Sequence, residues 1–248
     1  MSYKKIYFAS DFHLGTTNHE QSRKREDKII NWLNTIEKDA SDIYLVGDIF
    51  DFWFEHKYTI AKGTIRFQGK IASLIDKGIN IYFFTGNHDM WMFNYLEDEI
   101  GVRIYREPIE REINGKRFFI GHGDGLGPGD RKYKLIKRFF ANPFCQWLFA
   151  RIHPNLGFYI AHSWSNKSRK KDNTRDNFFM GEEKEFLIQF CKEELKTKNI
   201  DYFIFGHRHL PIDHKINNNC KYINLGDWIK YNTYAVFDGN EIELKEFS

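Results

Sequence analysis

Cysteine and long apolar runs are scarce in this sequence. Its three cysteines, Cys145, Cys191 and Cys220, are scattered and include no CxxC pair, so neither a disulfide framework nor a zinc knuckle is predicted. No apolar run approaches the roughly 20 residues that a transmembrane helix requires. The N-terminus leads directly into an apolar strand, so we expect no signal peptide and a reducing, cytoplasmic location.

Charge of one sign is not in large excess either. The 37 basic and 34 acidic residues give a net charge of +3, which is too small to predict nucleic-acid binding by the whole surface. The apolar share of 42% and the charged share of 29% are typical of a globular protein. The length of 248 residues suits a single domain, and no repeat or linker indicates a boundary.

Apolar runs that end in Gly, Asp, Asn or His are the most informative feature that is present. The run from Ile43 to Val46 leads into Gly47-Asp48, and a continuous run of this kind predicts a strand buried on both faces. Asp48 would then lie at the carboxyl edge of a sheet, where open α/β folds place their ligands. For this strand alone, an Asp that caps the next helix is an equally good interpretation.

Four other apolar runs end in the same way, which favours one shared site over independent helix caps. They lead into Asp11-Phe12-His13, Gly86-Asn87-His88-Asp89, Gly121-His122-Gly123-Asp124 and Gly206-His207-Arg208-His209. Because residues i and i+2 of a strand point to the same side, Asp11 with His13 and His207 with His209 are expected to converge. The histidines without this context are expected to be structural: His19, His56, His153, His162 and His214.

The seven candidate metal ligands are Asp11, His13, Asp48, Asn87, His122, His207 and His209. Seven ligands are too many for one tetrahedral zinc ion but suit two metal ions that share a bridging carboxylate. A mixture of imidazole, carboxylate and amide oxygen favours Mn²⁺ or Fe²⁺, with Zn²⁺ as an alternative and Mg²⁺ less favoured. We therefore predict two divalent cations, with Mn²⁺ as the first choice.

The remaining pattern predicts an α/β fold with a helical insertion. Helices are expected at residues 20–38, 69–76 and 182–196, and the first two connect parallel strands. Asn114-Gly115 predicts a type I′ hairpin turn. Residues 125–180 depart from the strand and helix alternation, and we expect them to form a helical lid over the strand edge.

The strand-end motifs resemble those of the calcineurin-like metallophosphoesterases. Asp11-x-His13, Gly47-Asp48-x-x-Asp51, Gly86-Asn87-His88-Asp89, Gly121-His122 and Gly206-His207-x-His209 occur in the order of that family. The resemblance implies a four-layer αββα sandwich in one domain, residues 1–248, with a dinuclear site at the loop end. It implies that Asp11, His13 and His209 hold one metal, that Asn87, His122 and His207 hold the other, and that Asp48 bridges them. His88 would then be a catalytic residue that contacts the scissile phosphate without binding a metal.

Within that family, the length and the insertion are similar to the UDP-2,3-diacylglucosamine hydrolases of lipid A biosynthesis. This implies hydrolysis of a nucleotide-activated lipid to UMP and a diacylglucosamine 1-phosphate (lipid X), by a cytoplasmic enzyme associated peripherally with the inner membrane. It also implies substrate-binding residues, which are Asp130, Tyr133, Ser163, Lys167 and Lys170. The sequence departs from the hydrolases at His88, where Arg is expected, and after the tryptophan in Trp53-Phe54-Glu55-His56, where an acidic Gly-Asp-Asp is expected.

Aromatic residues in the insertion favour a lipid substrate on physical grounds. More apolar surface is present than so short a segment needs for its own packing, from Phe139, Phe140, Phe144, Trp147, Leu148 and Phe149. Basic residues nearby suit an anionic head group or a membrane surface. Alternatively, the aromatics seat the insertion on the sandwich. Single-stranded nucleic acid would also suit this composition, but the helical period of the aromatics disfavours it, and we expect no nucleic-acid partner.

Two further functions are open at this stage. One is a metal-dependent phosphodiesterase or nuclease that acts on a soluble substrate, and the other is a non-catalytic scaffold whose metal site has decayed. The complete ligand set and His88 favour an enzyme, because a scaffold has no physical need for seven converging ligands.

Overall fold

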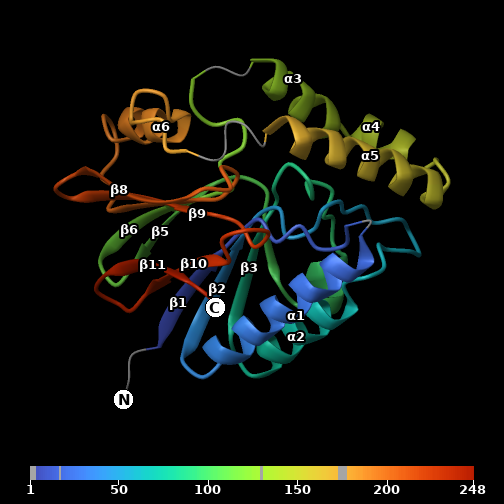
Figure 1. Cartoon of the computed structure of the whole chain (residues 1–248), viewed down its shortest axis with the longest axis horizontal. Coiled ribbons are helices and arrows are strands. Elements are labelled where there is room, and N and C mark those ends of the chain that lie inside the picture. Colours follow the sequence, from blue (N-terminus) through green and yellow to red (C-terminus); the bar gives the residue numbers. More distant parts are fainter. Residues whose placement is uncertain (1–3, 17, 129–130, 173–177) are drawn as a thin grey trace.

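Two β-sheets pack face to face between two layers of helices (Figure 1). The computed structural model describes residues 4–16, 18–128, 131–172 and 178–248, without the side chains of residues 131, 132 and 166–172. Within these residues, one sheet has six strands in the order β11-β10-β1-β2-β3-β4 and the other has five in the order β5-β6-β7-β9-β8.

The elements have the following bounds. The strands of the first sheet are β1 (Lys5–Ala9), β2 (Ala40–Val46), β3 (Asn80–Phe84), β4 (Arg103–Tyr105), β10 (Thr233–Phe237) and β11 (Ile242–Glu246). Those of the second are β5 (Ile109–Ile113), β6 (Lys116–Ile120), β7 (Tyr202–Phe205), β8 (Pro211–Asn217) and β9 (Cys220–Leu225). The helices are α1 (His19–Ile36), α2 (Ile65–Asp76), α3 (Arg131–Phe140), α4 (Pro143–Phe149), α5 (Pro154–Asp172) and α6 (Phe186–Glu194), with a π-helical turn η1 (Leu96–Ile100).

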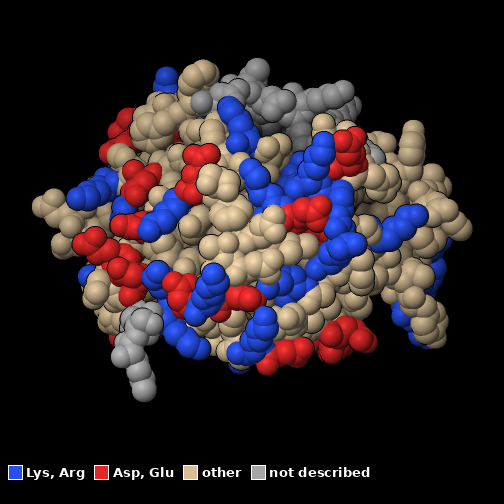
Figure 2. All heavy atoms as spheres, turned by 60° about the horizontal axis from the view of Figure 1, so that its bottom comes forward, with Lys and Arg blue, Asp and Glu red and all other residues tan. Residues whose placement is uncertain are grey.

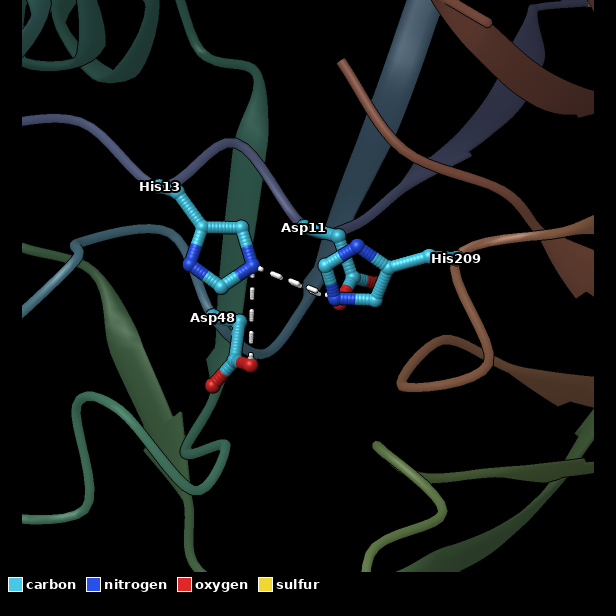
Figure 3. Close-up of side chains that lie close together, drawn as sticks. All are labelled: Asp11, His13, Asp48 and His209. Atoms are coloured by element: carbon cyan, nitrogen blue, oxygen red, sulfur yellow. Dashed lines mark hydrogen bonds and ion pairs between the residues drawn. The ribbon is translucent and has the colours of Figure 1, made fainter. Parts of the chain in front are cut away.

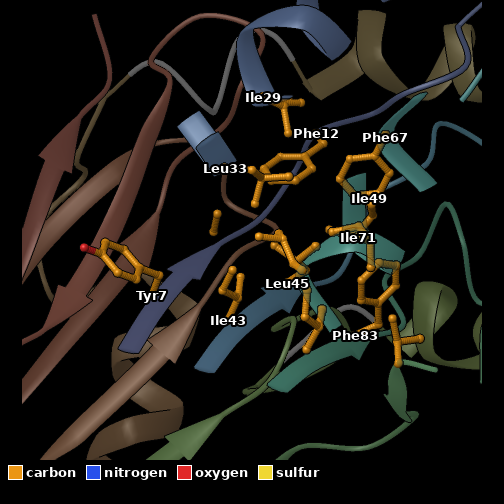
Figure 4. Packing of buried hydrophobic residues seen from close by; sticks show 14 of the residues in the cluster. Tyr7, Phe12, Ile29, Leu33, Ile43, Leu45, Ile49, Phe67, Ile71 and Phe83 are labelled. Carbon is orange, nitrogen blue, oxygen red and sulfur yellow. The ribbon is translucent and has the colours of Figure 1, made fainter. Parts of the chain in front are cut away.

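Three hydrophobic cores separate the four layers, which confirms the predicted αββα sandwich. Strand β1 shows how one sequence serves two of them, because its side chains alternate between the faces of the sheet. Tyr7 and Ala9 face α1 and α2, in the core shown in Figure 4, whereas Ile6 and Phe8 face the second sheet. The third core lies between the second sheet and α6. The central strands are therefore buried on both faces, as their continuous apolar runs predict.

Strand direction places the chemistry at one edge. Strands β1, β2, β3 and β4 run parallel, and so do β6, β7 and β9 in the other sheet. The predicted hairpin joins β5 to β6, and Asn114 and Gly115 both have positive φ (51° and 74°), as a type I′ turn requires. The carboxyl ends of the parallel strands thus meet at the side of the molecule where the insertion helices lie (Figure 1).

Two helices begin at residues other than those predicted, because tertiary contacts decide their first turns. Helix α2 starts at Ile65, a turn before the predicted residue 69, and Glu26 of α1 accepts a hydrogen bond from the backbone N–H of Phe67. Helix α6 starts at Phe186 instead of residue 182, and the carboxylate of Glu185 pairs with Arg208 at 3.1 Å. In both cases the deciding partner lies far away in sequence.

Helices α3, α4 and α5 form the insertion and pack on the sandwich through aromatic rings. The ring of Phe149 lies 4.8 Å from those of both Phe54 and Trp91, and the indole of Trp91 donates to the carbonyl of Phe140. These contacts give Phe54 a structural role, because its ring seats α4 on the sandwich. The next residue, Glu55, accepts hydrogen bonds from the backbone N–H groups of Asn94 and Tyr95.

The surface carries charges of both signs. On the face shown in Figure 2, Lys and Arg side chains gather in a band right of the centre, and acidic side chains are interspersed with basic ones elsewhere. Some of these charges are paired along α1, as in Lys24 with Glu20 and Arg23 with Asp27. Among the helices in the described ranges, none is both long and apolar enough to cross a bilayer.

Candidate metal centre

The loops after β1, β2 and β7 bring four of the predicted ligands together. Figure 3 shows Asp11, His13, Asp48 and His209 pointing toward one another, and their ligand atoms lie within 4.8 Å of each other. His13 Nε2 is 3.3 Å from His209 Nε2 and 3.8 Å from carboxylate oxygens of both Asp11 and Asp48. Two imidazoles and two carboxylates in this arrangement suit a divalent cation of the Mn²⁺, Fe²⁺ or Zn²⁺ type.

A buried atom supports this fit. Oδ1 of Asp11 is inaccessible to solvent and has no well-aligned hydrogen-bond donor in the described part of the chain, although protonated His209 forms an ion pair with it through Nε2 at 3.1 Å. A buried carboxylate oxygen without a hydrogen bond is costly unless a cation takes the place of the donor.

The other three ligands form a second group beside Asp48. Oδ1 of Asn87 lies 3.2 Å from His122 Nε2 and 2.9 Å from His207 Nδ1. Oδ2 of Asp48 is 3.5 Å from His122 Nε2 and 3.8 Å from His13 Nε2, so this carboxylate lies between the two groups. The Val46 carbonyl, an acceptor only, lies 2.9 Å from His122 Nδ1, which therefore carries the ring proton and leaves Nε2 to bind.

The backbone conformation of the ligand loops was not foreseen. Five of the seven candidate ligands have left-handed backbones, which are Asp11 (φ 56°), His13 (45°), Asp48 (52°), His207 (65°) and His209 (54°). Strand alternation is therefore the wrong reason for their convergence, because tight turns beyond the strand ends produce it. A non-glycine residue in this region costs on the order of 1–3 kcal/mol and persists only where its surroundings hold it, typically at functional sites.

The glycines of the motifs allow the backbone to pass close to the ligand carboxylates. A Cβ atom on Gly206 would lie 2.6 Å from Oδ2 of Asp11, and one on Gly86 would overlap the carboxylate of Asp48. The absence of a side chain also leaves Asp11 Oδ2 free to accept the backbone N–H of His207 at 3.1 Å. These glycines are required by the space beside the carboxylates.

Three carboxylates that were given no role in the sequence analysis support the ligands. Asp89 accepts backbone hydrogen bonds from Gly86 and from Asp48 and the two residues after it, which ties two ligand loops together. Asp227 lies 3.4 Å from His209 Nδ1, and Asp51 lies 3.8 Å from His13 Nδ1. A signal for Asp227 existed, because Leu225-Gly226-Asp227 is another apolar strand that ends in Gly-Asp.

Charges in the metal-free centre divide the four histidines into two kinds. Burial lowers the pKa of His13 to about 4, and burial together with the charge of His122 lowers that of His207 to about 4. Burial opposes protonation of His122 and His209 as well, but Asp48 raises the pKa of His122 to about 10, and Asp11 raises the pKa of His209 well above its usual value. At neutral pH the first pair is ready to bind a cation and the second pair carries protons.

Loading the metal-free protein with Mn²⁺ at pH 7 is expected to release about two protons, because His122 and His209 must lose theirs before they bind a cation. The apparent affinity should therefore rise with pH above 7. Calorimetric titrations in two buffers of different ionisation enthalpy measure the release. The matched variant His122→Gln should release about one proton fewer, and metal binding without proton release would contradict the assignment of both residues.

His88 lies beside the centre. Its backbone N–H donates to Asp48 Oδ1 at 2.9 Å, and its ring centroid is 4.7 Å from that of His13. Nδ1 of His88 lies 3.0 Å from the carbonyl oxygen of Asp51 and is thereby engaged. Nε2 makes no hydrogen bond with the described residues, and the role of His88 toward a substrate stays a prediction.

The predicted substrate-binding residues differ in their position relative to the centre. The Tyr133 hydroxyl donates to Asp124 at 2.7 Å, and the Tyr133 ring centroid is 6.4 Å from that of His207, so this residue borders the centre. Ser163 is exposed on α5, where its hydroxyl donates to the carbonyl of Tyr159. Asp130 lies outside the described residues, as do the side chains of Lys167 and Lys170.

An αββα sandwich with clustered Asp, His and Asn side chains at its strand ends is the architecture of a metal-dependent phosphoesterase. The family model described as calcineurin-like phosphoesterase matches residues 4–211, and this chain belongs to that family.

The similar curated proteins narrow the comparison. The chain is 40% identical to "UDP-2,3-diacylglucosamine hydrolase" of Porphyromonas gingivalis, over 97% of each chain. It is 28% identical to proteins of the same name from Actinobacillus succinogenes, over 90% of this chain and 92% of that one, and from Vibrio atlanticus, over 98% of both. The resemblance drawn from the strand-end motifs is confirmed.

Proposed function

We propose that this chain hydrolyses the pyrophosphate of UDP-2,3-diacylglucosamine, giving UMP and a diacylglucosamine 1-phosphate, in lipid A biosynthesis. The observation that carries the proposal is the convergence of seven Asp, His and Asn ligands at the strand ends of both sheets, in a chain 40% identical to a hydrolase of that name. Pyrophosphate hydrolysis needs cations that neutralise phosphate oxygens, and this ligand set suits two of them.

The residues divide into two cation sites. Asp11, His13 and His209 would hold one ion and Asn87, His122 and His207 the other, with the Asp48 carboxylate shared, and Mn²⁺ is favoured over Fe²⁺ and Zn²⁺. Two such cations supply charge neutralisation at the phosphate and an acidified water as the nucleophile. His88, held at Nδ1, presents Nε2 to the phosphoryl group or the leaving oxygen, and it donates there as the imidazolium, in which both ring nitrogens carry a proton.

Exposed apolar side chains on the insertion are the proposed site for the acyl chains. Phe144 is 64% exposed and Trp147 is 51% exposed, and their rings stack at 6.0 Å. Other large apolar side chains are exposed on the same helices: Leu135, Ile136, Phe139, Leu148, Tyr159 and Trp164. Phe140 and Phe149 instead pack on the sandwich, so for these two the structural alternative holds and the lipid interpretation is withdrawn.

The same exposed surface suits a peripheral association with the cytoplasmic side of the inner membrane. The guanidinium of Arg151 lies 4.7 Å from the ring centroid of Trp147, so a cation and an aromatic ring are adjacent at the exposed end of α4. Such pairs suit the boundary between lipid head groups and acyl chains.

Replacing Phe144 and Trp147 together by Ser is expected to raise KM for UDP-2,3-diacylglucosamine by about tenfold or more. Each buried methylene contributes about 0.8 kcal/mol, so losing contact with a few methylenes has an effect of this size. Hydrolysis of the soluble diester bis-p-nitrophenyl phosphate should be unchanged, because this compound has no acyl chains to contact Phe144 and Trp147. Steady-state kinetics of both substrates on Mn²⁺-loaded protein make the comparison, with Tyr58→Ser, another exposed aromatic, as the matched control.

The wild-type protein decides between the candidate functions in the same assay. Release of UMP from the lipid supports the proposal. Hydrolysis of the soluble diester without any release of UMP would indicate a phosphodiesterase with another substrate. A protein that hydrolyses neither compound when loaded with metal would be a scaffold.

A further inference from the structure

A polar side chain of the insertion reaches the catalytic side of the centre. Ser165 of α5 is 5% exposed, and its hydroxyl donates to Oδ1 of Asp51 at 2.9 Å, although the two residues are 114 positions apart. The hydroxyl oxygen of Ser165 also lies 3.2 Å from Nδ1 of His88, a residue 77 positions earlier in the sequence. Helix α5 therefore contributes a group to the surroundings of the imidazole that faces the substrate.

The directions of these hydrogen bonds are determined by the partners. The backbone oxygen of Asp51 is an acceptor only and lies 3.0 Å from His88 Nδ1, so Nδ1 carries the ring proton. Ser165 gives its single hydroxyl proton to the Asp51 carboxylate, which leaves its lone pairs for the N–H of His88. The result is a continuous chain from His88 Nδ1–H through Ser165 Oγ–H to Asp51 Oδ1.

This chain of bonds has a consequence for the ring of His88. The Asp51 carbonyl and the Ser165 hydroxyl both accept from Nδ1, which keeps this nitrogen protonated and restricts rotation of the ring. With the ring held in this way, Nε2 is the nitrogen presented to the substrate. Loss of the hydroxyl would leave only one acceptor and a ring with more freedom.

We propose that Ser165 is a positioning residue, which orients His88 toward the substrate and makes that orientation depend on the docking of α5. The inference rests on the proposed function, in which His88 contacts the phosphoryl group. The insertion would accordingly serve the reaction in two ways, with exposed apolar side chains for the substrate and one buried hydroxyl for the catalytic imidazole.

His162, one turn before Ser165, offers a matched control. Its Nδ1 lies 3.3 Å from Oδ2 of Asp51, and its ring packs near Phe52 and Phe158. It therefore anchors the same helix to the same carboxylate, whereas its contacts in the described residues do not include His88. A variant of His162 removes one neighbouring contact between α5 and Asp51 while Ser165 and the hydrogen bonds of His88 stay in place.

The experiment compares Ser165→Ala, Ser165→Thr and His162→Ala, each loaded with Mn²⁺, in hydrolysis of bis-p-nitrophenyl phosphate. Ser165→Ala is expected to lower kcat by about 10- to 100-fold with little change in KM, which is the usual loss when a supporting hydrogen bond is removed. Ser165→Thr should recover most of the rate because the hydroxyl returns, and His162→Ala should stay within about twofold of the wild type. If Ser165→Ala does not fold, Ser165→Cys, with nearly the same volume and a weak donor, takes its place.

The double variant His88→Ala/Ser165→Ala shows whether Ser165 acts through His88. It should be no slower than His88→Ala alone, because the positioned group is already gone. An unchanged kcat in Ser165→Ala, or the same fall in both backgrounds, would overturn the inference while leaving the proposed function intact. If His88→Ala itself leaves the rate unchanged, the role of His88 in the proposed function is wrong instead.

Nuclear magnetic resonance provides a readout that a purely structural role would not change. In protein loaded with diamagnetic Zn²⁺, long-range ¹H–¹⁵N spectra should show a sharp Nδ1–H resonance for His88 in the wild type and a shifted, broadened one in Ser165→Ala, because one of the two acceptors of this N–H is lost. His162→Ala should retain the wild-type pattern. A pattern for His88 that is the same in all three proteins would count against the positioning role.

Discussion

Asp48→Asn is expected to lower kcat/KM for UDP-2,3-diacylglucosamine by about 10³-fold or more. Oδ2 of Asp48 lies between the two ligand groups, 3.5 Å from His122 Nε2 and 3.8 Å from His13 Nε2, so a neutral side chain weakens both sites at once. A loss of roughly 4 kcal/mol in transition-state stabilisation corresponds to this factor, and metal ions contribute several kcal/mol. Kinetics with added Mn²⁺ and metal analysis of the purified protein measure the two effects together.

Asp42→Asn is the matched control for this prediction. Asp42 lies on the same strand, β2, and its carboxylate accepts hydrogen bonds from Asn80 and from the hydroxyl of Tyr82, away from the centre. This variant should keep its metal and remain within about twofold of the wild-type rate. An Asp48→Asn protein that retains two metal ions and full activity would exclude Asp48 as a shared ligand.

His88→Ala is expected to lower kcat by about 10²- to 10⁴-fold while the metal content stays nearly constant. The hydrogen bond between this residue and the ligand groups comes from its backbone N–H, which donates to Oδ1 of Asp48 and survives in the variant. The imidazole is held at Nδ1 by the Asp51 carbonyl, so the substitution removes a group oriented for the substrate. Single-turnover kinetics and elemental analysis of the same preparation check the rate and the metal content.

The corresponding control is His214→Ala. His214 contacts Glu182 at the surface of β8, and its loss should leave both rate and metal content unchanged. If His88→Ala lost one metal ion per chain, the residue would be a ligand and not a substrate contact.

Local sequence determined which strands are buried on both faces and the chemical type of the centre, whereas the four layers were implied by the family resemblance. A continuous apolar run such as Ile43 to Val46 has no polar face, so both of its faces must be buried. Parallel strands then bring their carboxyl ends to one edge, and the residues that follow each run show which ligands meet there. The turn at Asn114-Gly115 could also be predicted from the sequence. A type I′ turn needs a left-handed backbone at both central residues, and few residue pairs other than Asn-Gly adopt it easily.

The geometry of the ligands was decided by the tertiary structure. The left-handed backbones of Asp11, His13 and Asp48 are unfavourable for the residues themselves, so propensity could not predict them. They are maintained by contacts between loops, such as the four backbone hydrogen bonds that Asp89 accepts. The same limit applies to the first turn of α6, where the pairing of Glu185 with Arg208 decides the outcome.

The insertion shows most clearly which features the sequence determined and which the tertiary structure decided. Its periodicity determined that helices form and that they carry large apolar faces, but a period does not state what covers a face. Packing on Phe54 and Trp91 covers part of Phe149, whereas Phe144 and Trp147 remain exposed. Ser165 gave no signal in the sequence, because its partners His88 and Asp51 come near only when α5 docks. Local patterns thus determined the elements and the ligand types, whereas contacts between distant residues decided which side chains act together.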